Sequence, residues 1–208
     1  MDYMAEPKFS FLKRLLSTIV LFSLMTCLSA VTVATADSKK TYKNRQYGFT
    51  LKYPSIYKIK TSGQWGFDLI RDDRIILRAN IEDNAFKIFI KESKHKENLF
   101  LDFARERAKV ICGADGPDGS THCGAIDNEK QYTSANGLNC LEFYLLMTRE
   151  DYSTNTKYLS KVGPIYVVDI SREERPLALM IFSGYGKLAS TSTELMMWEV
   201  VDTIKLVP

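Results

Sequence analysis

The sequence predicts an α+β fold in which an antiparallel β-sheet is flanked by helices. Two observations carry this prediction. Short segments that alternate apolar and polar residues recur through most of the chain at the spacing of β-hairpins. Two other segments, one central and one at the end of the chain, repeat their apolar residues every three or four positions, as amphipathic helices do. With no internal repeat or linker to divide the chain, helices packed against the sheet are the simplest arrangement.

The first predicted strand ends at Pro54, after Phe49, Leu51 and Tyr53 have alternated with polar residues on one face. Asn136-Gly137 is a strong two-residue turn signal between two further strands. The complete set of predicted strands is 42–54, 56–60, 65–70, 74–79, 85–91, 129–134, 138–148, 157–162, 165–171 and 177–182.

The central helix is predicted from residue 97 to just before Gly113, because apolar residues recur there at spacings of three and four. The second helix is predicted near the C-terminus, where Thr191, Ser192 or Thr193 can cap it. Trp198 is expected to pack in the core with the methionines beside it. The predicted buried side of this helix consists of Met196, Met197, Val200, Val201 and Ile204.

The N-terminal residues 1–36 have the pattern of a cleavable signal peptide. Lys8, Lys13 and Arg14 precede an uncharged, apolar run over residues 15–30. Small residues at positions 34–36 then suit a signal peptidase, which places the cut after Ala36 and begins the mature protein at Asp37. The sequence therefore predicts an exported protein, in the periplasm or outside the cell.

Two other uses of the N-terminal segment remain open. The uncharged stretch is long enough to serve as an uncleaved membrane anchor, although its second half is rich in Ser and Thr. Cys27 is a possible lipidation site, although Met25 and Thr26 stand where small residues are preferred. Contact with a membrane is expected only if the segment is retained.

Cleavage leaves residues 37–208, a length typical of one domain. It removes three basic and two acidic residues from a chain of net charge +3, so the mature domain is close to neutral. Mixed charges of this kind give no field that concentrates a phosphate backbone, and nucleic acid is therefore not an expected partner.

Cys112, Cys123 and Cys140 remain after cleavage, and export makes a disulfide the expected use of two of them. Pairing of Cys112 with Cys123 is favoured, because the glycine-rich and proline-containing segment between them turns back easily. Cys140 would then be a buried free thiol in an apolar strand. The alternative pairing joins Cys123 to Cys140.

The segment between the two paired cysteines is the most unusual local sequence, and it supplies the candidate site residues. Asp115 and Asp118 have oxygen ligands that suit Ca²⁺, but Asp next to Gly is also typical of ordinary turns. His122 precedes Cys123, where a nucleophilic Cys–His pair is disfavoured by the expected disulfide. Trp65 is a further candidate contact residue, since Trp is enriched at interfaces.

The segment 42–54, which reads Y-x-N-x-x-Y-G-F-T-L-x-Y-P, resembles the opening of PsbP-like domains. The capped helix followed by V-D-T-I-K-L at residues 201–206 is similar to the end of the same domains. The resemblance implies a Mog1/PsbP-like α/β/α sandwich and an exported bacterial member of unknown function. Members of this group are mainly binding or assembly modules, and no catalytic motif is shared among them.

The sequence therefore favours an exported, non-enzymatic module, without a cofactor, that binds a protein or an envelope component. It contains two histidines in all and none of the common hydrolase or phosphate-binding motifs. Two alternatives are a metal-dependent hydrolase that uses the 112–123 loop, and a small-ligand carrier with a crevice between sheet and helix.

Overall fold

A computed structural model describes residues 38–93, 98–112, 121–151, 153–173, 175–184 and 189–208. The expected signal peptide, and the loop that contains Asp115 and Asp118, lie outside the described residues. The part of the chain from Ser38 to Pro208 forms one compact unit.

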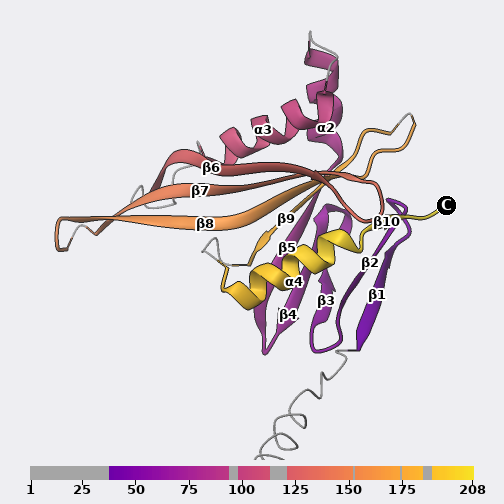
Figure 1. Ribbon diagram of the computed structural model, residues 1–208, viewed down its shortest axis with the longest axis horizontal. Coiled ribbons are helices and arrows are strands. Elements are labelled where there is room, and N and C mark those ends of the chain that lie inside the picture. Colours follow the sequence, from indigo (N-terminus) through magenta and orange to yellow (C-terminus); the bar gives the residue numbers. More distant parts are fainter. Residues whose placement is uncertain (1–37, 94–97, 113–120, 152, 174, 185–188) are drawn as a thin grey trace, which may run out of the picture. The chain divides into compact units, whose positions relative to one another are not determined.

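Seven strands form the main sheet, in the order β3-β4-β5-β9-β8-β7-β6, and every neighbouring pair is antiparallel (Figure 1). Their bounds are β3 Lys58–Thr61, β4 Gly66–Arg71, β5 Arg74–Glu82, β6 Thr121–Thr133, β7 Asn139–Asp151, β8 Thr156–Asp169 and β9 Ala178–Ser183. A smaller antiparallel sheet consists of β1 Lys39–Asn44, β2 Phe49–Pro54 and β10 Lys205–Leu206. The helical elements are η1 Gly63–Trp65, α2 Asp83–Glu92, α3 Leu99–Cys112 and α4 Thr191–Asp202.

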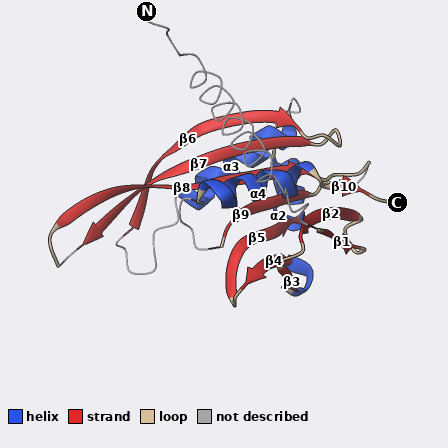
Figure 2. Ribbon diagram, turned by 60° about the horizontal axis from the view of Figure 1, so that its bottom comes forward, coloured by secondary structure: helices blue, strands red, loops and turns tan. Residues whose placement is uncertain are grey.

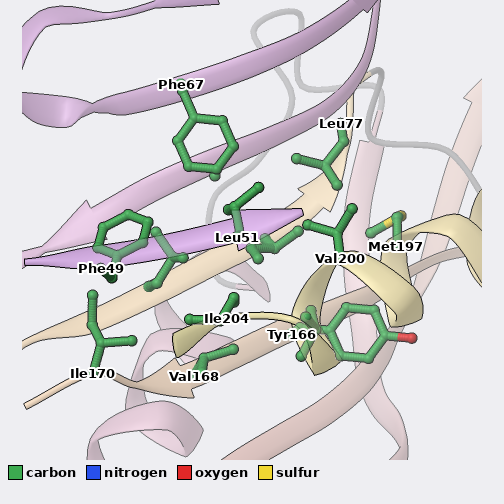
Figure 3. Packing of buried hydrophobic residues seen from close by; sticks show 14 of the residues in the cluster. Phe49, Leu51, Phe67, Leu77, Tyr166, Val168, Ile170, Met197, Val200 and Ile204 are labelled. Carbon is green, nitrogen blue, oxygen red and sulfur yellow. The ribbon is translucent and has the colours of Figure 1, made fainter. Parts of the chain in front are cut away.

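One hydrophobic core lies between the main sheet and a layer formed by α4 and the small sheet (Figure 3). Phe49 and Leu51 of β2 are fully buried there, against Val200 of α4 and Tyr166 of β8. The predicted alternation of the first strand thus points its apolar residues into this core.

A second core lies on the other face of the main sheet, beneath α2 and α3. Phe86 of α2 stacks on Phe103 of α3, with 4.4 Å between ring centroids. Strand β9 serves both cores, because Leu179 and Ile181 point to the first and Ala178 and Met180 to the second. A strand buried on both faces explains why the predicted strand 177–182 is apolar throughout.

The prediction of a strand over residues 85–91 is wrong, because this segment forms α2. The apolar residues of this segment fit a helical period as well as an alternating one. Phe86 and Phe89, three positions apart, both pack in the second core, whereas Ile88 is 54% exposed. Asp83 in the first turn favours the helix, and Lys87 lies one turn later with its Nζ 2.6 Å from the Asp83 carboxylate.

Other predicted strands also differ in extent from the structure. The predicted strand 129–134 is the end of a longer strand, β6, which begins at Thr121. Residues 42–54 form a hairpin of β1 and β2, in which Gly48 ends the turn with φ +67°. The predicted strands 157–162 and 165–171 are one continuous strand, β8, whose register shifts opposite Phe143 near Gly163-Pro164. A glycine and a proline mark turns in most sequences, but here they occupy a bulge.

Both predicted helices are confirmed, as α3 and α4. The Ser190 side chain caps α4 by accepting a hydrogen bond from the Thr193 backbone N–H at 3.3 Å, one residue before the predicted caps. Met196 and Met197 are buried as expected, but the expectation for Trp198 is wrong, since it is 45% exposed. Trp198 lies on the outer side of the helix, opposite the residues that fill the core.

Candidate binding surface

Strands β7 and β8, with the start of β6 beside them, form an arm whose outer part extends beyond the ends of α3 and α4 (Figures 1 and 2). We define the arm as residues 121–127, 144–151 and 156–162, and its base, which includes Leu145 and Val162, packs in the second core beneath α3. Its strands stay paired almost to the tip, where Glu150 lies opposite Lys157 with 2.5 Å between their charged groups. The β7 and β8 strands are 13 and 14 residues long, which is what carries the arm past the helices.

A disulfide holds the arm against the second core. Cys112, the last residue of α3, is bonded to Cys123 in β6, so the predicted pairing is confirmed. Cys140 is a buried free thiol, as expected for that pairing. Burial raises the pKa of the Cys140 thiol to about 12, so it remains protonated near neutral pH and is a poor nucleophile.

The face of the arm on the α4 side carries a row of side chains from all three strands. His122, Thr148 and Leu159 lie opposite one another in consecutive strands. Since side chains alternate along a strand, Thr148 shares its face with Tyr144, two pleats nearer to α4. Leu159 is 72% exposed on this face.

Tyr144 connects the base of the arm to α4. Its hydroxyl donates a 2.5 Å hydrogen bond to Oε1 of Glu194 in the first turn of that helix. The Nζ of Lys161 lies 4.2 Å from the centre of the Tyr144 ring and 3.0 Å from the Asp127 carboxylate. Burial and the acceptor Glu194 both raise the pKa of Tyr144, which therefore acts as a donor at neutral pH.

Glu142 extends this polar group along β7. It lies opposite Lys130 of β6 and Tyr166 of β8. Burial raises the pKa of the Glu142 carboxyl, Lys130 partly offsets that rise, and the charge of Glu194 adds to it. Exposed Trp198 follows Glu194 by one helical turn and so lies along the same edge of α4.

We expect replacement of Glu142 by glutamine to stabilise the protein more at pH 7 than at pH 4. A carboxyl whose pKa is raised by folding disfavours the folded state as pH rises from its ordinary value of 4.5. The amide has no charge to desolvate, so the difference in Tm between variant and wild type should grow with pH. Glu106→Gln, at an exposed site on α3, is the control. If the difference in Tm from the wild type grew equally with pH for Glu142→Gln and Glu106→Gln, the prediction would be contradicted.

The structure separates the residues that the sequence proposed as one site. Trp65 is 62% exposed on η1, before β4, whereas the disulfide is on β6 at the opposite edge of the sheet. His122 is exposed on the arm and contributes to the electrostatic environment of Glu150. Asp115 and Asp118 fall outside the described residues.

Sequence reasoning missed the polar group at the base of the arm. Glu142 was the available signal, because it is the single charged residue in the apolar run 138–147. The contact that completes the group, between Tyr144 and Glu194, spans 50 positions, and no local pattern connects the two. Within the described ranges, no group of three or more His, Cys, Asp or Glu residues is placed to hold a metal ion. Nor does any helix of that part of the chain have the length and apolar character needed to cross a bilayer.

No protein-family model matches the sequence, and no curated protein matches it significantly. Among solved structures, the cyanobacterial PsbP (CyanoP) of Synechocystis sp. PCC 6803 aligns with a TM-score of 0.51 at 12% identity, over 85% of this chain and 97% of that one. The Saccharomyces cerevisiae Ran-binding protein Mog1p has a TM-score of 0.41 at 8% identity, over 83% and 97%. A Bacteroides thetaiotaomicron VPI-5482 protein has a TM-score of 0.37 at 14% identity, over 81% and 48%. The cyanobacterial structure confirms the predicted PsbP-like α+β fold.

Proposed function

We propose that this chain is an exported, non-enzymatic binding module that holds a protein or envelope component on the α4 side of its arm. The observation that carries the proposal is the exposure of Leu159 on this face of an arm that a disulfide fastens to the domain. Exposed apolar side chains on a rigid element lose water on binding without a large cost in ordering. Exposed Trp198 adds aromatic surface on α4, and aromatic residues are enriched at interfaces.

The edge of the sheet supports recognition by side chains over recognition by strand addition. Strand β6 is the outermost strand and would be the docking edge for an added strand. Its pairing with β7 is broken by two register shifts, at Cys123/Ala125 and at Asp127/Lys130. Bulges of this kind interrupt the row of backbone donors and acceptors that an incoming strand needs. The face of the arm is therefore the better binding surface.

The groups at the base of the arm favour binding over catalysis. Tyr144 and Glu194 already satisfy each other, and Lys161 is held between the Tyr144 ring and Asp127. The free thiol, Cys140, is buried with a raised pKa and does not supply a nucleophile. A mixed surface of charged and aromatic groups is well suited to a partner with matching polar and apolar groups.

A photo-crosslinking amino acid at position 159 should give a discrete adduct in the native host. The same amino acid at Ile88, which is exposed on α2, is the control and should give none. Thr148→Arg places a large charge directly opposite residue 159 and should reduce the adduct. Equal labelling from both positions, or no adduct at 159, would reject the arm as the binding surface.

Export is tested separately by the intact mass of the full chain expressed in an export-competent host. We expect a mature protein that begins at Asp37, because Ala36 is the predicted cleavage residue. A mass that retains residues 1–36 would favour the anchor, and a lipid adduct at Cys27 would favour lipidation. Either result would reject the cleaved form while leaving the arm proposal intact.

A further inference from the structure

A pocket rich in arginine lies at the opposite end of β8 from the arm. It forms where the β1–β2 turn meets the segment between β8 and β9 and the C-terminal residues, and it encloses about 400 Å³ of space, part of which is open to solvent. Arg45, Tyr47 and Gly48 come from the first of these, Arg172 and Arg175 from the second and Pro208 from the third. The arm proposal uses none of these residues.

Arg172 is a half-buried cation that has no acidic partner among the described residues, which do not include Glu174. Its Nη2 donates to the backbone carbonyls of Gly48 and Val207, and no hydrogen-bond partner of its buried Nε is found in that part of the chain. Among the described residues, no carboxylate lies within the 4.0 Å ion-pair distance of its guanidinium. Buried charges in proteins are normally paired, so this guanidinium is short of negative charge.

Arg175 differs from Arg172 because it has a carboxylate partner, Asp83, which it shares with Lys87. Its Nη2 donates to the Asp83 carboxylate at 3.3 Å and its Nη1 to the carbonyl of Gln46 at 3.1 Å. The guanidinium also lies 4.8 Å from the centre of the Tyr47 ring, which fixes its plane. Exposed Arg45 adds a third cation at the pocket mouth. Within the described part of the chain, the positive charges of Arg45 and Arg172 therefore have no paired carboxylate.

The Arg172 guanidinium lies close to the backbone of Gly48 at the pocket wall. A Cβ at residue 48 would lie 2.6 Å from Cζ of Arg172, and the local φ of +67° also favours glycine. The hydrogen bonds from Nη2 to the carbonyls of Gly48 and Val207 place the Arg172 head group at this wall.

We propose that this pocket binds an oxyanion, the carboxylate or phosphate group of a ligand. Planar guanidinium groups match such oxyanions in geometry and form charge-assisted hydrogen bonds with them. An anion here would supply the charge that Arg172 lacks, and Arg45 would close over it. A free phosphate and the headgroup of an anionic lipid both carry such an oxyanion. The experiment below distinguishes these two sources.

The test uses the full chain, exported and purified, with inorganic phosphate added against chloride at constant ionic strength. We expect a saturable rise in Tm in the millimolar range, with a shift of the Arg172 Nε–H resonance in ¹H–¹⁵N spectra. Dihexanoyl phosphatidic acid below its micelle concentration is the second probe. Tighter binding of this probe assigns the site to a lipid headgroup, and equal or weaker binding assigns it to a free anion.

Arg45→Gln is the informative variant, because Arg45 is exposed and makes none of the hydrogen bonds described above, so the fold should be retained. It should weaken phosphate binding about tenfold, as expected for one charge-assisted contact. Arg74→Gln removes the same charge from an exposed position on β5 and should bind as the wild type does. Equal loss in the two variants, or no preference for phosphate over chloride, would overturn the proposal.

Discussion

Replacing Gly66 with alanine should lower the stability of the domain by about 4 kcal/mol, or roughly 10 °C in Tm. Gly66 joins η1 to β4 with φ +147° and ψ −152°, a conformation that only glycine adopts readily. A Cβ there would overlap the carbonyl oxygen of Ala79 in β5 and lie 2.9 Å from its carbonyl carbon. Because the obstacle is backbone in a paired strand, the clash is relieved only by separating β4 from β5.

Gly63→Ala is a matched control three residues earlier. Gly63 has φ +63°, but a Cβ at this position would meet nothing within 4 Å. It should therefore cost only the backbone strain of a left-handed residue, about 1 kcal/mol. Thermal or urea unfolding of both variants measures the difference. Similar losses for Gly63→Ala and Gly66→Ala would show that the close approach of β4 and β5 does not determine the stability.

The central helix was predicted well because its pattern is set by one neighbouring layer. Residues 100–108 face a single sheet, so their helical period is plain in the sequence. The strand prediction for residues 85–91 failed because a helix of 10 residues has too few turns to distinguish a helical period from alternation. The prediction of two separate strands around Gly163-Pro164 failed because the local sequence does not show that the residues on both sides continue to pair with β7.

The resemblance at residues 42–54 succeeded because several of its residues are constrained by the fold. The Asn44 side chain accepts a 3.0 Å hydrogen bond from the Tyr47 backbone N–H and so shapes the turn. Tyr47 packs beneath Arg175, and Gly48 makes room for Arg172. Positions with such requirements keep their residue types when the rest of a sequence changes, so a short motif can identify a fold.

The candidate site was predictable only in part, because its residues come together through strand register. The disulfide followed from the glycine- and proline-containing sequence between two nearby cysteines, which is local information. The contact between Tyr144 and Glu194 spans 50 positions, and the opposition of His122 to Thr148 depends on a register shift. Neither can be read from composition or spacing, since a shift of one residue moves every side chain to the other face.

Replacing both Cys112 and Cys123 with serine should lower the free energy of unfolding by about 3 kcal/mol in the chain-entropy model. The bond closes a loop of 11 residues in sequence separation, and without it the unfolded chain gains freedom. Urea unfolding of variant and wild type measures the loss. A reductant should lower the free energy of unfolding of the wild type to that of the variant, and it should leave the stability of the variant unchanged. Equal stability of the two proteins without reductant would contradict the prediction.

The same double variant should loosen the arm more than the rest of the domain. Cys123 lies in β6 where the arm leaves α3, whereas β1 and β2 pack in the other core. Amide hydrogen exchange should therefore accelerate in residues 121–126 and remain slow in β2. If the arm is the binding surface, crosslinking from residue 159 should weaken although Leu159 itself is untouched, because a mobile arm must be ordered on binding. Faster exchange in the arm with undiminished crosslinking would show that binding does not need the arm held in place.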